Sequence, residues 1–122
     1  MKCRCCVPLG VLFSMTALST PAAAQDAVEA DLRCLVVGYA LSGSEQETHK
    51  SAAVPFSLYY LGRVDGRSPA IDLGKRLGDL ATSMTSDDLK ADAARCGADY
   101  QRRASALQAA GKTLQDRARA AQ

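Results

Sequence analysis

Apolar side chains recur every three or four residues along much of the chain, which is the spacing of one helix face. From about Asp26 to Leu41 this pattern is continuous, and acidic residues lie in the first turns, where the helix dipole favours negative charge. Gly43 follows as a suitable stop. The pattern predicts a first helix over residues 26–41, with an apolar face formed by Val28, Leu32, Leu35, Val36 and Tyr39.

A second helical region follows and contains a proline. Residues 44–47 have the S-x-x-E form of a capping box and predict a short polar helix up to about Ala53. Proline lacks an amide proton and restricts the residue before it, so Val54-Pro55 is expected to break or kink this helix. Pro55 then suits the first turn of a renewed helix. The apolar face of that helix contains Phe56, Leu58, Tyr59, Tyr60, Leu61 and Val64.

The end of this region allows two interpretations. As a helix, it would stop at Gly66, and Gly62 inside it would mark the close approach of another helix. As a β-hairpin, Asp65-Gly66 would form the two-residue turn between two strands. Pro69 would interrupt the returning strand, and hydrophobic alternation fails over residues 58–61, so the helix is favoured.

Two further helices complete the predicted fold. Ser68-Pro69 supplies an N-cap and a first helical residue for a third helix, whose apolar face contains Ile71, Leu73, Leu77, Leu80, Ala81 and Met84. Thr85 can cap a long last helix, and Asp87 and Asp88 suit its dipole. The apolar side of this helix contains Leu89, Ala93, Cys96, Tyr100, Ala104, Leu107 and Leu114, and its end after Gly111 is expected to fray. The sequence therefore predicts a single all-α domain of about four helices.

The residues before the first helix have the form of a cleaved signal peptide. The first four residues carry the positive charge, Val7 to Leu18 is apolar, and Ala22-Ala23-Ala24 supplies the small residues that a signal peptidase recognises. Cleavage after Ala24 would separate a signal peptide, residues 1–24, from a domain of residues 25–122. A short membrane anchor is the alternative, but the apolar run is well under the roughly 20 residues that a span needs. We therefore expect a periplasmic protein with no membrane span after cleavage.

Removing the signal peptide changes the charge balance. The whole chain has 15 basic and 13 acidic residues, and two of the basic ones, Lys2 and Arg4, leave with the signal peptide. The remaining 98 residues are enough for one domain and carry 13 charges of each sign. No basic field is left to indicate nucleic acid or an anionic membrane surface as a partner.

The cysteines divide in the same way. Cys3, Cys5 and Cys6 lie in the predicted signal peptide, which leaves Cys34 and Cys96 in the exported domain. An even number of cysteines in an oxidising compartment predicts one disulfide. It would close a loop of about 62 residues and stabilise the domain by ~4 kcal/mol. A reactive thiol pair is the alternative, but the C-x-x-C spacing of such pairs is missing.

The chain contains little that indicates catalysis. Its one histidine, His49, lies on a polar segment, where a solvated side chain is the usual case. No zinc-type spacing, nucleophile elbow or phosphate-binding glycine loop occurs. Asp87, Asp88 and Asp92 could form a carboxylate cluster, but the helix start explains the first two without a metal. We expect no cofactor, no metal site and no enzymatic activity; an enzyme with a dispersed site and a structural role in the envelope stay open.

Function is expected to lie in protein–protein contact. The candidate partner-binding residues lie near the predicted end of the second helical region and are Tyr59, Tyr60, Arg63, Asp65 and Arg67. The two tyrosines are also expected to lie mostly in the core, with one hydroxyl left at the surface. The three charged residues are expected to form a solvated, partly paired group around the helix stop.

The arrangement of these features resembles the HdeA-like group of small periplasmic helical proteins. The similarity covers roughly residues 32–100: Cys34 early in the first helix, an aromatic-Leu-Gly helix over Tyr59 to Gly66, and Cys96 in a late helix. That group includes acid-stress chaperones and, on a similar fold, immunity proteins of type VI secretion. This chain departs from the chaperones in three ways. Its interval between the cysteines is longer, its last helix extends well past Cys96, and an Ala/Arg/Gln stretch replaces their Lys-rich tail.

The resemblance implies two hypotheses. In the first, the protein is a chaperone that binds unfolded clients: near pH 2–3 most carboxylates are protonated, and the net charge of about +13 or +14 loosens the fold or a homodimer. In the second, the protein is an inhibitor or immunity-type protein that blocks one specific partner through the region from Tyr60 to Arg67.

Overall fold

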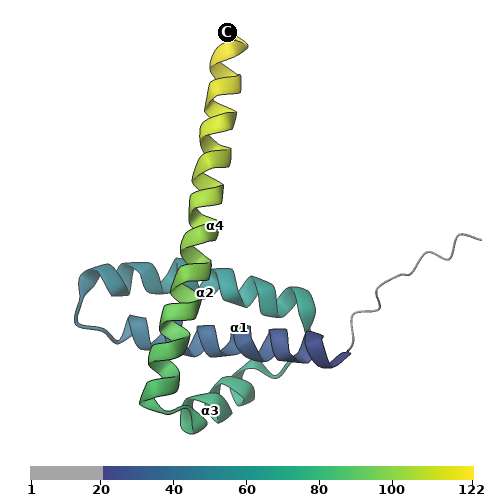
Figure 1. Cartoon of the computed structure of the whole chain (residues 1–122), viewed down its shortest axis with the longest axis vertical. Coiled ribbons are helices and arrows are strands. Elements are labelled where there is room, and N and C mark those ends of the chain that lie inside the picture. The colour runs from purple at the N-terminus through teal and green to yellow at the C-terminus, as the bar shows by residue number, and fades with distance from the viewer. Residues whose placement is uncertain (1–20) are drawn as a thin grey trace, which may run out of the picture.

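The computed structural model describes residues 21–122, and its four regular elements are all helices (Figure 1). They are α1 (Pro21–Ser42), α2 (Glu47–Arg67), α3 (Leu73–Ser83) and α4 (Ser86–Ala120). α1 and α2 lie side by side and run in opposite directions, α3 lies beside α1, and α4 crosses this layer and projects beyond it (Figure 1). No strand occurs within residues 21–122, so the predicted all-α class is confirmed and the hairpin is excluded.

α1 begins earlier than predicted. It starts at Pro21 rather than Asp26, so Ala22, Ala23 and Ala24 belong to its first turns and are exposed. The charged and apolar parts of the predicted signal peptide, residues 1–18, lie outside the described residues. Within the described part of the chain, no helix has the length and hydropathy needed to cross a membrane.

Pro55 neither breaks nor restarts α2, which contradicts the predicted break and renewed helix. The helix is continuous from Glu47 to Arg67 and contains Pro55 on its exposed side. The buried residues before and after the proline lie on one face of the helix and pack into the same core; they are Ala53, Phe56, Tyr60 and Val64. Burial of this common face outweighs the hydrogen bond that proline removes, because water can reach the unpaired carbonyl on the exposed side.

Both predicted ends of α2 are also wrong. Gln46 occupies the N-cap without a side-chain bond, while the Ser44 hydroxyl accepts a bond from the Gln46 amide, 3.2 Å away. Gly66 is helical rather than a left-handed stop, and the helix continues to Arg67. Gly62 is exposed, and no helix approaches it.

α3 starts four residues after the predicted position. Its N-cap is Asp72, whose side chain accepts a hydrogen bond from the Lys75 amide, 3.0 Å away. Ser68-Pro69 instead forms a turn, in which the Ile71 amide donates to the Ser68 carbonyl at 3.1 Å. Asp72 is a stronger cap than Ser68 because its negative carboxylate also interacts favourably with the positive end of the helix dipole.

The predicted start of α4 is confirmed, and the fraying expected after Gly111 stays a prediction. Thr85 and Asp88 form a capping box: the Thr85 amide donates to the Asp88 carboxylate at 2.9 Å, and the Asp88 amide donates to the Thr85 hydroxyl at 3.1 Å. The helix then continues through Gly111 to Ala120. The apolar stripe is buried only in its first half, since Leu107 and Leu114 are exposed.

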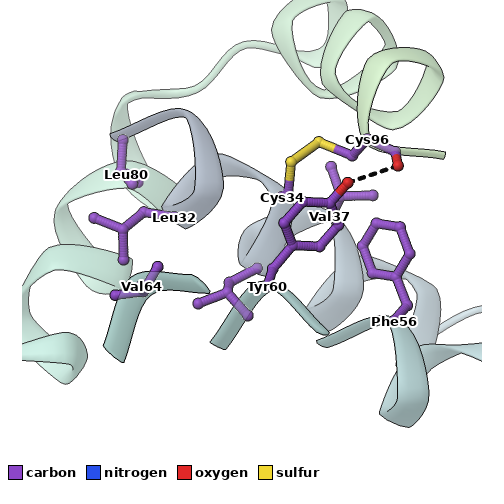
Figure 2. Packing of buried hydrophobic residues seen from close by; sticks show 9 residues of the cluster. Leu32, Cys34, Val37, Phe56, Tyr60, Val64, Leu80 and Cys96 are labelled. Carbon is purple, nitrogen blue, oxygen red and sulfur yellow. Dashed lines mark hydrogen bonds between the residues drawn. A yellow bond between two sulfur atoms is a disulfide. The ribbon is translucent and has the colours of Figure 1, made fainter. Parts of the chain in front are cut away.

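The core lies where α1, α2 and the first half of α4 meet, with Leu80 of α3 at one end (Figure 2). Its buried apolar residues are Leu32, Cys34, Leu35, Val37, Phe56, Tyr60, Val64, Leu80 and Cys96. The periodicity therefore located most of the core, but not every predicted apolar position is buried. Tyr39 of α1 is 80% exposed and Leu58 of α2 is 62% exposed, in addition to the two exposed leucines of α4.

Two glycines on neighbouring helices are expected to respond oppositely to substitution. A Cβ on Gly38 would lie 2.2 Å from Ser57 Oγ and 3.3 Å from the Phe56 ring, so Gly38 allows α1 and α2 to approach closely. A Cβ on Gly62 would meet nothing within 4 Å. Gly38→Val should destabilise the fold by about 1–3 kcal/mol through overpacking, and Gly62→Ala should stabilise it by about 0.5–1 kcal/mol through helix propensity. Urea unfolding of the two variants tests both signs; equal effects would contradict this assignment.

Candidate functional site: aspartate–arginine contacts between the helices

Asp31 of α1 is a buried carboxylate held by two arginines of α2. It is 1% exposed. Arg63 binds it in a bidentate manner, with Nε 3.1 Å from one oxygen and Nη2 3.0 Å from the other, and Arg67 forms a second ion pair with it. Two cations around one carboxylate satisfy the charge that burial would otherwise leave unpaired. These contacts fix α1 against the last turns of α2.

Arg63 also connects α2 to α4. Its Nη1 lies 2.5 Å from Asp99 Oδ2 and donates to the Tyr59 hydroxyl at 2.8 Å. The Tyr59 hydroxyl donates in turn to Asp99 at 3.0 Å, and Arg102 binds the other Asp99 oxygen at 2.6 Å. One guanidinium therefore bridges carboxylates of two different helices, Asp31 and Asp99.

A third carboxylate, Asp92 of α4, repeats the arrangement toward α1. It is 7% exposed, and Arg33 Nε lies 2.6 Å from it. Arg95 binds Asp92 at 2.9 Å and donates to the Ala30 carbonyl at 3.0 Å. Arg33 also lies 3.4 Å from Asp88. We call Asp31, Asp92 and Asp99 with their partners Arg33, Arg63, Arg67, Arg95 and Arg102 the aspartate–arginine cluster.

Asp99 and Arg63 keep their charges at neutral pH. Burial by itself would raise the pKa of the Asp99 carboxyl, but hydrogen bonds from Arg102 and Tyr59 and the charge of Arg63 place that pKa below its ordinary value. Burial would lower the pKa of Arg63, but the Tyr59 hydroxyl and the charge of Asp31 raise it. Burial and the negative charge of Asp99 raise the pKa of Tyr60, so its phenol stays protonated.

The disulfide and Tyr60 hold α4 at the centre of the same contact. Cys34 and Cys96 are joined across α1 and α4, with their Cα atoms 5.7 Å apart, as the even cysteine count predicted. Tyr60 is 1% exposed, and its hydroxyl donates to the Cys96 carbonyl at 2.7 Å (Figure 2). The ring of Phe56 lies 5.0 Å from the Tyr60 ring. The covalent, aromatic and ionic contacts of α4 therefore all converge on one face of the α1/α2 pair.

The candidate partner-binding residues do not form one exposed surface. Tyr60 is buried, Tyr59 and Arg63 are half-buried within the cluster, and Arg67 pairs with Asp31. Asp65 and Arg67 are both exposed, but Arg67 is held in its ion pair with Asp31. Both hydroxyls are hydrogen-bonded to α4, that of Tyr59 to Asp99 and that of Tyr60 to the Cys96 carbonyl.

Sequence reasoning did not identify the three aspartates as partners of these arginines. Asp31 was grouped with the acidic residues that suit the helix dipole, and Asp92 was considered only as part of a carboxylate cluster with Asp87 and Asp88 for which no metal was expected. A usable signal was present: each of the three aspartates lies three residues from a buried or partly buried apolar position, namely Cys34, Leu89 and Cys96. An acidic residue in phase with an apolar stripe indicates a buried ion pair.

His49 is exposed, and its Nδ1 lies 3.2 Å from the Ser44 hydroxyl. Across residues 21–122, no three His, Cys, Asp or Glu side chains are grouped so that they could hold a metal ion.

An apolar groove opens between α1, α2 and α3 on a face to which α4 contributes no residue. Its volume is about 320 Å³. The residues around it are Leu35, Gly38, Tyr39, Ser42, Ala53, Val54, Ser57, Leu58, Leu61, Leu73 and Leu77, and none of them is charged.

Comparisons of the chain with protein-family models, curated proteins and solved structures find no match. The resemblance to the HdeA-like group therefore stays a prediction from the layout of the residues, and the geometry of the cluster and the groove carries the functional argument.

Proposed function

We propose that this protein is an exported, non-enzymatic chaperone-like protein that binds unfolded proteins when acid loosens its aspartate–arginine cluster. The observation that supports this is the placement of Asp31, Asp92 and Asp99 between helices, each against arginines of an opposing helix. The export and the periplasmic location rest on the signal-peptide pattern of residues 1–24.

Acid acts directly on these contacts. Asp99 faces Arg63, Tyr59 and Tyr60 of α2 and Arg102 of its own helix. Because the pKa of Asp99 is lowered in the folded protein, its ion pairs stabilise the fold above its unfolded pKa of about 3.9. That stabilisation is lost as the pH falls through the lower folded value. The arginines keep their charge, so the same faces then repel one another.

The surface that loosening uncovers is apolar. Phe56 and Tyr60 of α2 and Tyr100 of α4 pack together between the helices, with ring centroids 5.0 and 5.4 Å apart. The disulfide keeps α4 attached to α1 while the noncovalent contacts open. Such an opening exposes a limited aromatic surface that can bind apolar segments of an unfolded protein and closes again at neutral pH.

An Asp99→Asn variant tests the role of the cluster. Asparagine mimics the protonated carboxyl, so we expect a loss of about 1–3 kcal/mol at pH 7 and an opening transition at higher pH than in the wild type. Asp65→Asn is the matched control, because Asp65 is exposed on α2, and it should leave the transition unchanged. The measurement is ANS fluorescence with near-UV circular dichroism from pH 7 to pH 2, together with aggregation of an acid-denatured client.

Two outcomes would contradict the proposal. The first is a wild-type protein that gains no ANS fluorescence and protects no client down to pH 2. The second is an equal displacement of the transition by both variants, since this would place the acid response in the net charge rather than in the cluster.

A further inference from the structure

The charges of the chain are divided between its body and its projecting helix end. Residues 21–100 contain 12 acidic and 8 basic side chains, whereas residues 101–122 contain one acidic and five basic side chains. We call residues 101–122 the arm. The arm consists almost entirely of the second half of α4, which extends away from the other helices in Figure 1. The charges of residues 21–122 balance in total but are unevenly distributed: residues 21–100, which we call the body, are acidic, and the arm is basic.

The arm also carries an apolar stripe that nothing in the described chain covers. Leu107 and Leu114 are 75% and 66% exposed and lie two helical turns apart on one face. Small residues alternate with them at steps of three and four: Ala104, Gly111 and Ala118. A helix face with two leucines between small residues can approach another surface closely and insert both leucines into it.

The apolar groove has the dimensions and surroundings to receive this stripe. Val54 and Leu61 line it seven residues apart on α2, which is the same spacing as Leu107 and Leu114, about 10 Å along a helix. Two acidic residues lie close in sequence to residues that line the groove, while the basic residues close to it are ion-paired within their own chain: Lys50 with Glu47, Lys75 with Asp79 and Arg76 with Glu29. Asp65 lies one turn beyond Leu61 on the same face of α2, and Glu45 lies three residues after Ser42 of the groove.

The arm cannot reach the groove of its own chain. α4 binds the side of α2 that presents Tyr59, Tyr60 and Arg63, whereas Val54, Leu58 and Leu61 of the groove lie on other sides of that helix. α4 is also a single helix from Ser86 to Ala120, so the arm has no break at which it could turn back. A basic apolar helix that fits the groove is available from a second copy of this chain.

We propose that the arm of one copy binds the apolar groove of another copy, with Leu107 and Leu114 in the groove and the basic residues of the arm near Asp65 and Glu45. The contact is heterologous, because two different surfaces meet. The contact is proposed for the folded protein at neutral pH and is independent of the acid-induced opening proposed above.

Two single substitutions at exposed positions separate the two surfaces. Leu58→Glu places a charge in the groove, and Leu107→Glu places one on the arm stripe; Leu58 is 62% exposed, so neither change disturbs the core. Ala109→Glu is the matched control, because it adds the same charge on the opposite side of the arm. The full-length gene is expressed, and the exported protein is studied at pH 7 by sedimentation velocity at increasing concentration and at 50 and 500 mM salt.

We expect the wild type and Ala109→Glu to associate with affinities within about threefold, and more weakly at high salt. Leu58→Glu and Leu107→Glu should each be monomeric alone. Mixed together they should form a one-to-one complex, because one variant retains an intact arm and the other an intact groove. This complex also shows that both variants are folded.

Several results would overturn the proposal. Association of Leu58→Glu alone would indicate arm–arm pairing, and association of Leu107→Glu alone would indicate contact between bodies. A mixture that stays monomeric, or a wild type that is monomeric at millimolar concentration, would show that the groove does not receive the arm.

Discussion

Reduction of the Cys34–Cys96 disulfide is expected to leave the domain unfolded or barely folded at neutral pH. The bond closes a separation of 62 residues, for which the loop-entropy model gives a stabilisation of ~4 kcal/mol. The folded chain has little reserve against such a loss, because its core is small and half of α4 makes no contact with it. Domains of about 100 residues are commonly stable by only 5–15 kcal/mol.

Urea unfolding of the exported protein, followed by far-UV circular dichroism, measures this loss directly. The oxidised wild type is compared with the reduced wild type and with the double variant Cys34→Ser/Cys96→Ser. The reduced protein and the double variant should have similar, much lower midpoints, and reductant should have no effect on the double variant. A reduced protein with the midpoint of the oxidised one would show that the helices hold together without the bond.

The features that follow from helical periodicity were predictable. Apolar residues at steps of three and four identified the four helices and most of the core, because burial of one face is the main contribution to helix stability in a small domain. The pairing of Cys34 with Cys96 followed from the even cysteine count, and the structure confirms that both lie on facing helices.

The helix ends were predicted less well, because local preferences were outweighed by tertiary contacts. Pro55 is tolerated inside α2 since Phe56 and Ala53 bind the core on either side of it. Gly66 does not end the helix, because Arg67 in the next position is held by its ion pair with Asp31. Turn and cap propensities of about 1 kcal/mol are small beside such contacts.

The aspartate–arginine cluster could be predicted only in part. Arg63 and Arg67 were singled out, but as a local group with Asp65. Their true partners, Asp31 and Asp99, lie more than 30 residues away in sequence, at separations of 32 and 36. Sequence periodicity indicates which face of a helix is buried, but not which faces of two helices contact each other. The ion pairs depend on how α4 crosses α1 and α2, which periodicity does not give.

Substitution of Tyr60 by alanine is expected to be the most destabilising change of a single side chain, with a loss of about 3–5 kcal/mol. Tyr60 is the largest of the fully buried side chains. Its ring packs against Phe56 and Tyr59, with centroids 5.0 and 4.7 Å away. Removing it leaves a cavity at the point where α1, α2 and α4 meet, beside the disulfide.

A Tyr60→Phe variant separates this packing contribution from the hydroxyl bond to Cys96. The Cys96 carbonyl lies inside α4, whose backbone still offers it a helical hydrogen bond, so we expect a loss of only about 1 kcal/mol. Tyr39→Ala is the exposed control and should change stability by less than about 0.5 kcal/mol at concentrations where the chain is monomeric. In urea unfolding, the loss of stability should therefore be far larger for Tyr60→Ala than for Tyr60→Phe, and larger for Tyr60→Phe than for Tyr39→Ala.

If Tyr60→Phe lost as much stability as Tyr60→Ala, the hydrogen bond to α4 rather than core burial would be the dominant contact. The docking of α4 would then depend mainly on polar groups, both at Tyr60 and in the aspartate–arginine cluster.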